Sequence, residues 1–204
     1  MWLVRIIYRK GRRAERGEND MRKLIETTHV SLGGEVGSID DWVFPYLDEE
    51  HKAYTARQLR EADSLLLGRM TYEGFSAAYP TMSGGDSAMF TEFIERINAI
   101  PKYVASTTLR EATWNATVID GDVASFVEDL KQQPGGNIIK YGNGPLDVRL
   151  MEHGLIDEFH LLLTPVAVGK GQHLFEDIDT APSLNLADVT RFRNGVVVLV
   201  YTPR

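Results

Sequence analysis

Three short turns rich in glycine, hydroxyl and arginine residues are the parts of this sequence best suited to chemistry. The first is Gly68-Arg69-Met70-Thr71, which follows the apolar run 65–67. Glycine lets the backbone approach a ligand closely, and the arginine guanidinium is a forked donor that suits phosphate. Thr71 can cap a following helix, whose N-terminus then favours an anion. The stretch predicts an anion site, although a plain strand, turn and capped helix with one surface arginine would read the same.

Two further turns of this kind follow later predicted strands. The hydroxyl run Ser106-Thr107-Thr108 ends the strand predicted at 101–106, and Gly142-Asn143-Gly144 ends the strand predicted at 137–141. In an open α/β sheet, ligands bind beyond the carboxyl ends of parallel strands. Three such turns at one edge would suit an extended ligand with several phosphates, such as a dinucleotide. The Rossmann fingerprint G-x-G-x-x-G is missing after the first strand, so we predict a different dinucleotide-binding fold.

The order of the predicted elements gives the fold class. Strands alternate with helices and then give way to two strands joined at Asn194-Gly195, a strong hairpin signal. This order predicts an α/β fold with a mixed central sheet, flanking helices and a C-terminal antiparallel hairpin. The predicted strands are 23–31, 64–68, 101–106, 117–119, 137–141, 156–168, 184–192 and 196–202, and the predicted helices are 48–62, 72–78, 87–99, 123–131 and 145–153.

The first 20 residues stand apart from the rest of the chain. They hold six Lys/Arg against three Asp/Glu, whereas the whole chain has a net charge of −7. Because this composition cannot build a core, we predict a disordered extension at 1–20, with a basic contact arm as the alternative. Residues 21–204 are predicted to form one domain.

Composition excludes several classes of function. The chain has no cysteine, which rules out disulfides, thiolate catalysis and cysteine metal sites and is compatible with a reducing cytosol. Its acidic body argues against nucleic acid as a partner, and no apolar run approaches the roughly 20 residues that span a bilayer. The five histidines show no metal-ligand spacing, and those at 29 and 160 fit packed or hydrogen-bonded strand positions. We therefore predict a cytoplasmic protein without a metal, nucleic-acid or membrane partner.

Four stretches of the sequence, 64–73, 101–109, 138–150 and 155–175, together resemble the dihydrofolate reductase-like superfamily. The most specific blocks are LLLGRxTYE and DEFHLLLTPVxxGxG. The most similar branch includes the C-terminal reductase domain of the bifunctional riboflavin-biosynthesis deaminase–reductase. This resemblance, which covers about 21–204, implies a mixed central sheet, NADPH as hydride donor and often a homodimer.

The resemblance also assigns cofactor-binding roles to matching residues. It places the Gly-Arg-x-Thr motif on NADPH phosphates, the hydroxyl turn near the adenosine 2′-phosphate, and the later glycines at the pyrophosphate. An arginine beside those hydroxyls implies a preference for NADPH over NADH. The residues it implies are Gly68, Arg69, Thr71, Ser106, Thr107, Gly142, Asn143 and Gly144, with Thr108 less directly matched, and the late strand-to-turn residues Pro165, Gly169 and Gly171 are read as structural.

One departure from the family pattern concerns the segment after the first strand. The branch usually has Ser-Leu-Asp-Gly, whereas this chain has Ser31-Leu32-Gly33-Gly34. The missing aspartate puts a shared substrate contact, or a shared loop geometry, in doubt at this position.

The proton donor is not identified by the sequence. Hydride transfer to a C=N or carbonyl group needs a matching proton, and dihydrofolate reductases proper use a carboxylate on the first helix. Asp48 and Glu49 open that helix here and are candidates, as is Glu50, but acids are also expected there from the helix dipole alone. The loop residues Asp40-Asp41-Trp42 are candidates for the substrate side, although Trp42 fits inward packing equally well.

Two functions from different classes follow. The first is an NADPH-dependent reductase of a small heterocycle, either a pteridine or a ribosylaminopyrimidine. Since the sequence has no zinc-deaminase motif, the bifunctional riboflavin enzyme is excluded as a whole, and a stand-alone reductase stays open. The alternative is a non-catalytic module that binds NADPH or another nucleotide. An α/β domain with unrelated small ligands is the plainest reading.

Overall fold

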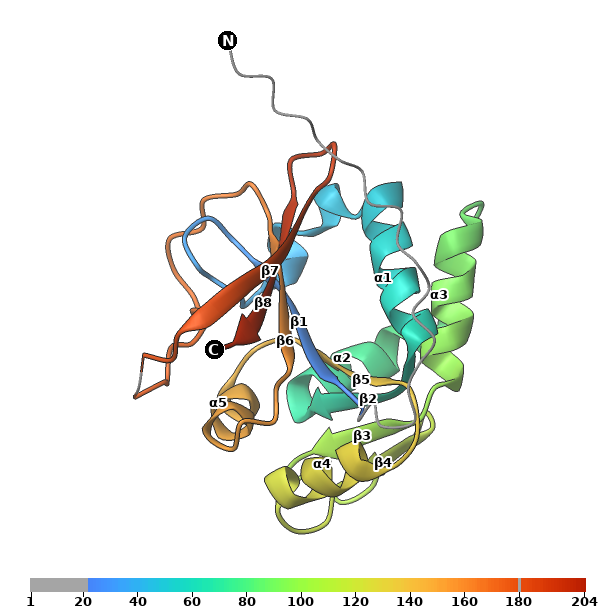
Figure 1. The fold of residues 1–204 in the computed structure, drawn as a ribbon. Helices are drawn as coiled ribbons and strands as arrows, with labels where there is room; N and C mark the ends of the chain where they lie inside the picture. Colours follow the sequence, from blue (N-terminus) through green and yellow to red (C-terminus); the bar gives the residue numbers. More distant parts are fainter. Residues whose placement is uncertain (1–21, 180) are drawn as a thin grey trace.

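The computed structural model, which describes residues 22–179 and 181–204, contains one eight-stranded mixed sheet (Figure 1). The strand order is β4-β3-β2-β5-β1-β6-β8-β7, and every pairing from β4 to β6 is parallel. The last two strands, β8 and β7, add as an antiparallel hairpin, so the predicted fold class is confirmed. The strands are β1 (Leu24–Val30), β2 (Ala62–Gly68), β3 (Lys102–Ala105), β4 (Ala116–Val118), β5 (Asn137–Tyr141), β6 (Glu158–Leu163), β7 (Leu184–Arg191) and β8 (Val197–Pro203).

Helices cover both faces of the sheet. Side chains alternate along β1, so that Leu24 packs with α4 and α5 while Ile25 packs with α1 and α3. Both faces are buried, which explains why β2 reads as a continuous apolar run rather than an alternating one. The helices are α1 (Glu49–Glu61), α2 (Arg69–Ala78), α3 (Ala88–Ala99), α4 (Val123–Gln132) and α5 (Pro145–Glu152), and short 3₁₀ turns occur at η1 (Ile39–Asp41), η2 (Phe44–Tyr46) and η3 (Tyr79–Thr81).

The long strand predicted at 156–168 is shorter in the structure. It ends at Leu163, because the Val166 N–H donates to the Thr164 carbonyl at 2.7 Å and makes a tight turn around Pro165. Proline has no N–H to continue a ladder. The chain then leaves the sheet and covers the loop that follows β1, where the Leu32 N–H donates to the Val166 carbonyl.

The start of α2 also differs from the prediction. The helix begins at Arg69, and the residue before it, Gly68, is the N-cap. Thr71 therefore lies in the first turn and does not cap the helix, so that part of the prediction was wrong. By contrast, Asp48 caps α1 as expected, since its carboxylate accepts from the Glu50 and His51 N–H groups.

Two further expectations concern the loops. The turn at Asn194-Gly195 joins β7 and β8, and Gly195 has φ of 96°, a conformation that glycine adopts without strain. In the loop after β1, Trp42 is buried and its indole N–H donates to the Gly37 carbonyl at 3.2 Å, so it packs inward. The prediction for 1–20 lies outside the described residues.

Within residues 22–179 and 181–204, every helix is too short or too polar to cross a bilayer.

Candidate functional site

The parallel strands bring the three predicted turns to one edge of the sheet. Gly68 at the end of β2 lies directly beside Ala105 at the end of β3, so the segments starting at Arg69 and Ser106 leave the sheet as neighbours. On the other side of β2, a side-chain carbon at Gly142 would lie 3.2 Å from the Thr71 hydroxyl oxygen. The first and third turns are thus in contact, as the topology argument required.

A cleft of about 640 Å³ opens at this edge, within the size range of small-molecule sites. It contains three of the predicted cofactor residues, Arg69, Ser106 and Thr107, together with Thr108. The glycines of the third turn lie just outside it, and the residues that follow them, Pro145 and Leu146, form its wall. The lining residues are Arg69, Ala105, Ser106, Thr107, Thr108, Ile119, Gly121, Asp122, Val123, Pro145, Leu146 and Arg149.

Arg69 forms an exposed ion pair with Glu73 and is still able to bind a ligand. Its Nη1 lies 3.0 Å from Glu73 Oε1, one turn further along α2, and both side chains are about half exposed. Exposed pairs at this spacing contribute only about 0.3–0.5 kcal/mol. The guanidinium can therefore leave Glu73 for a phosphate at little cost.

The hydroxyl turn is preformed. Ser106 Oγ accepts hydrogen bonds from the N–H groups of Thr108 at 3.2 Å and Leu109 at 2.9 Å. These bonds use the lone pairs of the serine and leave its proton able to donate to an outside acceptor. The Thr107 side chain is exposed at the cleft.

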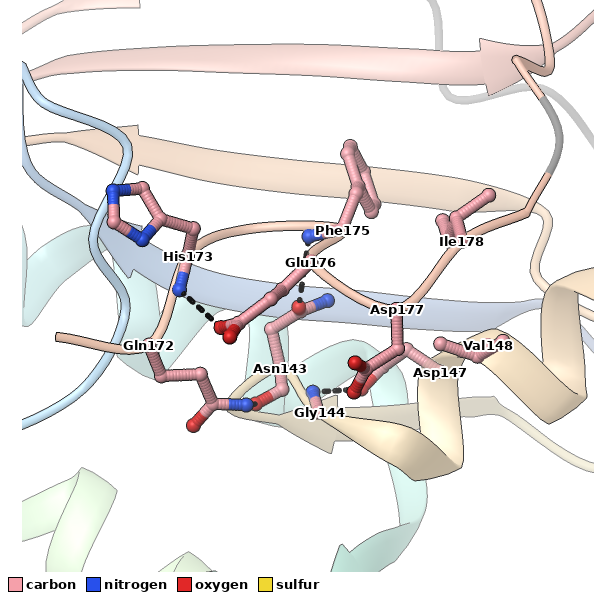
Figure 2. A pocket seen from close by; sticks show the side chains of 10 residues that line it. All are labelled: Asn143, Gly144, Asp147, Val148, Gln172, His173, Phe175, Glu176, Asp177 and Ile178. Atoms are coloured by element: carbon pink, nitrogen blue, oxygen red, sulfur yellow. Dashed lines mark hydrogen bonds between the residues drawn. The ribbon is translucent and has the colours of Figure 1, made fainter.

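The glycine turn is shaped by its own hydrogen bonds. The Gly142 N–H donates to the Thr27 carbonyl at 3.0 Å, and the Gly144 N–H donates to Asp147 Oδ2 at 2.8 Å (Figure 2). Gly142 has φ of 78°, which favours glycine. These two N–H groups are therefore already used within the protein, and the turn directs the start of α5 toward the cleft.

A buried ionic cluster lies beneath this turn. Lys140 Nζ is 2.7 Å from Asp147 Oδ2, both side chains are at most 3% exposed, and the ammonium also donates to the Gly142 carbonyl. Glu26, which pairs with Lys140 in the sheet register, is fully buried, and the Asn143 amide and the Lys140 ammonium are the groups that favour its ionised form. Burial, reinforced by the charge of Asp147, raises the pKa of Glu26 well above its usual value. The cluster fixes the turn, and nothing in the sequence around Glu26 indicated it.

The departure at Gly33 has a packing reason. A side-chain carbon there would lie 2.2 Å from the Val168 carbonyl oxygen and 2.5 Å from Glu35 Oε2, so aspartate does not fit. The buried Glu35 carboxylate occupies the adjacent space, where Ser31 Oγ donates to it and lowers its pKa. His173 Nε2 lies 3.5 Å from the same carboxylate.

The acids that open α1 already have structural partners. Asp48 caps the helix, and Glu49 binds Lys52 Nζ at 2.7 Å and Ser87 Oγ at 2.9 Å. Glu50 accepts from the Arg193 N–H at 2.6 Å. Glu49 and Glu50 line a separate groove of about 700 Å³ beside the start of α3, not the cleft that holds Arg69. As proton donors, Asp48 and Glu49 remain predictions.

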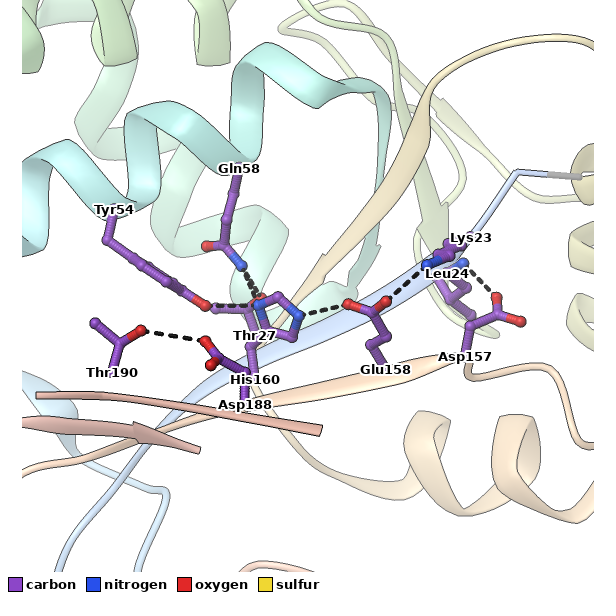
Figure 3. A network of polar contacts seen from close by, with 10 residues as sticks. All are labelled: Lys23, Leu24, Thr27, Tyr54, Gln58, Asp157, Glu158, His160, Asp188 and Thr190. Atoms are coloured by element: carbon purple, nitrogen blue, oxygen red, sulfur yellow. Dashed lines mark hydrogen bonds and ion pairs between the residues drawn. The ribbon is translucent and has the colours of Figure 1, made fainter. Parts of the chain in front are cut away.

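A polar layer lies between the sheet and α1. Tyr54 Oη and Gln58 Nε2 lie 2.7 and 2.9 Å from His160 Nδ1, and the other ring nitrogen is 2.8 Å from Glu158 (Figure 3). The hydrogen-bonded strand histidine expected at position 160 is thus confirmed. The neighbouring pair His29 and His51 has its Nε2 atoms 3.2 Å apart.

Burial favours the neutral form of His29 and His51 and leaves some polar atoms without a partner. Burial is the main cause that lowers the pKa of His29 to about 3 and that of His51 to about 4. Two buried atoms of the layer, His29 Nδ1 and Gln58 Oε1, lack a hydrogen-bond partner within the described part of the chain, as does Tyr141 Oη at the end of β5. Since buried polar groups are normally paired, these atoms mark places for a water or a polar ligand edge. Sequence reasoning missed the set because its members come from three separate segments.

In the described segments, no three His, Cys, Asp or Glu residues are grouped as a metal site would need.

Comparison with known proteins agrees with this architecture. The model of the RibD C-terminal domain family matches residues 22–198. The uncharacterized protein YyaP of Bacillus subtilis (strain 168) is 32% identical over 143 residues, which are 70% of this chain and 75% of that protein.

Two solved structures show the same fold at low sequence identity. A putative riboflavin biosynthesis protein from Shewanella sp. PV-4 has a TM-score of 0.67 at 18% identity, over 89% of this chain and 99% of that one. The deaminase/5-amino-6-(5-phosphoribosylamino)uracil reductase of Thermotoga maritima has a TM-score of 0.59 at 14% identity. The match covers 90% of this chain and 57% of that protein.

The mixed sheet with its flanking helices gives the chain the fold class that these riboflavin-biosynthesis proteins of known structure share. Within that class, the chain belongs to the RibD C-terminal domain family.

Proposed function

We propose that this protein is an NADPH-dependent oxidoreductase that reduces a small heterocyclic substrate by direct hydride transfer. One observation carries the proposal: Arg69, Ser106 and Thr107 converge on a 640 Å³ cleft at the carboxyl edge of the sheet. Membership of a reductase-domain family supports the same reading. The chain is acidic overall, so phosphates have to be held by such a local site.

The residues present fit the chemistry of NADPH. Arg69 and the hydroxyls of Ser106 and Thr107 would hold the adenosine 2′-phosphate, and the start of α5 after Gly144 would meet the pyrophosphate. Asn143 does not line this cleft: its Oδ1 accepts from the Phe175 N–H at 3.4 Å, and its amide faces the buried Glu26 carboxylate. When bound, NADPH supplies the hydride.

The polar layer beneath α1 supports a heterocycle as the substrate. Its unpaired atoms His29 Nδ1 and Gln58 Oε1, and Tyr141 Oη at the end of β5, offer hydrogen bonds of the kind that the edge of a pteridine or a ribosylaminopyrimidine requires. The proton that completes the reduction would come from water or from a nearby acid, for which Asp48 and Glu49 remain candidates.

The alternative is a non-catalytic module that binds NADPH or another nucleotide. It is favoured by the structural roles of the α1 acids and by the absence of room for a side chain at Gly33. Titration with NADPH and NADH, followed by NADPH oxidation over a panel of dihydropterins, pyrimidines and quinones, tests both functions. Turnover of one substrate supports the reductase, tight binding without turnover supports the module, and failure to bind either nucleotide contradicts the reductase and the NADPH-binding form of the module.

We also propose that the protein is a homodimer. The outer strand of the hairpin, β7, has exposed Leu186 and Val189 side chains and pairs with β8 alone among the described strands. Light scattering at several protein concentrations would show a mass of about twice 22.9 kDa if this is right. A monomer at all concentrations would contradict it.

A further inference from the structure

A second arginine, Arg149, lines the same cleft as Arg69. It lies on α5, five residues after Gly144, and so comes from the opposite side of the sheet from α2. Among the described residues, its charged partner is Asp122, which also lines the cleft and precedes α4. The cleft therefore holds two guanidinium groups and one carboxylate.

The two oxygens of the Asp122 carboxylate bind different partners. Its Oδ1 caps α4, accepting from the Ser125 N–H at 2.9 Å and the Ser125 hydroxyl at 3.1 Å, while its Oδ2 binds Arg149. These partners, the Ser125 N–H first, hold the pKa of Asp122 at about 2, so the carboxylate is charged at neutral pH. If the ion pair with Arg149 opened, Asp122 Oδ1 would still cap α4, and Oδ2 would be hydrated.

The pair is exposed enough to open. The Arg149 and Asp122 side chains are 48% and 39% exposed, so no buried charge is stranded when they separate. A phosphate monoester carries nearly two negative charges and accepts both arms of a guanidinium, whereas Oδ2 offers a single carboxylate oxygen. A phosphate in the cleft therefore competes well for Arg149.

We propose that Arg149 is a second phosphate-binding residue of this cleft, which exchanges Asp122 for the 2′-phosphate of NADPH and so sharpens the choice of NADPH over NADH. This inference rests on the proposed function, because it takes NADPH as the ligand. It makes Asp122 a competitor of the cofactor phosphate, in addition to its role as helix cap.

The test measures NADPH and NADH dissociation constants, by fluorescence quenching at low salt, for the whole chain and its variants. Arg149→Gln is expected to weaken NADPH binding about tenfold and NADH binding less than about twofold. Asp122→Asn keeps a good helix cap and frees Arg149, so NADPH should bind about two- to fivefold more tightly. In the double variant that gain should vanish, since no arginine is left to release.

A matched control is the exposed pair of Arg60 with Glu92, which lies outside the cleft and has side chains 50% and 44% exposed. Arg60→Gln removes the same charge and should leave both constants unchanged. Equal melting temperatures of Arg149→Gln and Arg60→Gln would show that folding is not the cause of a loss.

Three results would overturn the inference: unchanged NADPH binding by Arg149→Gln, equal weakening of NADPH and NADH, or a gain from Asp122→Asn that persists without Arg149. Each presupposes that the unmodified chain binds NADPH. A chain that binds neither nucleotide would refute the proposed function itself, so the two failures are distinguishable.

Discussion

The cleft and the ionic cluster beneath the glycine turn both contain paired charges, but the pairs differ in burial. In the cleft, Arg69 and Arg149 are each held by one exposed carboxylate. Under the turn, Lys140 and Asp147 are at most 3% exposed and also bind backbone groups of the turn. Exposed pairs exchange partners cheaply, whereas a buried pair that loses one member leaves an uncompensated charge. The exposed pairs therefore suit the proposed phosphate binding, whereas the buried pair holds the glycine turn in place.

The largest effect is expected from breaking the buried pair. Lys140→Met removes the cation beside Asp147 and Glu26 and should lower the free energy of unfolding by about 3–5 kcal/mol, as measured by urea denaturation. Arg60→Met, which breaks the exposed pair with Glu92, should cost less than about 1 kcal/mol. Similar losses in the two variants would remove the contrast between the regions.

A second prediction concerns the family aspartate missing at position 33. Gly33→Asp forces a side chain against the Val168 carbonyl and should destabilise the protein by about 1–3 kcal/mol in the same assay. Gly169→Ala is the control, because an added carbon there meets no described atom within 4 Å and the residue lies outside every helix and strand. A stable Gly33→Asp variant would mean that the loop after β1 is not packed as described.

The buried titratable groups predict opposite effects of pH. Because the pKa of His29 falls from about 6.5 to about 3 on folding, the unfolded chain binds more protons between these values. Stability should therefore fall as the pH drops from 7 to 5, by roughly 1–2 kcal/mol. His29→Gln should flatten this part of the profile, and an unchanged slope would contradict the assignment.

Glu26 should act in the other direction. Its pKa is raised in the folded state, so the folded chain binds the extra proton and stability falls as the pH rises above the usual glutamate range. Glu26→Gln should remove that loss and make the variant at least as stable as the parent at pH 8. A clear destabilisation at pH 8 would show that the ionised carboxylate is needed.

The most specific effect is expected in the cleft. Arg69→Ala should weaken NADPH binding about tenfold and NADH binding much less, because only NADPH carries the 2′-phosphate. Fluorescence titration measures both constants. Equal losses would mean that Arg69 does not read that phosphate.

The parts of the fold that local patterns encode were predictable. The Asn194-Gly195 turn, the Asp48 cap and the alternation of strands with helices depend on a few consecutive residues. The convergence of Arg69 with Ser106 followed from parallel topology alone, since adjacent parallel strands end at the same edge. The two errors also have local causes. Gly68, not Thr71, is the N-cap of α2, and a tight turn around Pro165 ends β6.

Long-range pairs were not predictable. Asp122 and Arg149 lie 27 residues apart on different elements, and each alone is an ordinary surface charge. Glu26 looked like one polar residue in a strand until the fold placed it against Lys140 and Asp147. Such sites depend on tertiary packing, which the spacing of residue types in a single sequence does not reveal.

A crystal structure of the chain with NADPH bound tests the central claim most directly. We predict that Arg69 and Ser106 meet the 2′-phosphate in the 640 Å³ cleft, while Lys140 and Asp147 keep their present contacts beneath the turn. Such a structure would also show which side chains lie near the nicotinamide. NADPH bound away from the cleft, or a phosphate that touches neither Arg69 nor Ser106, would contradict the account.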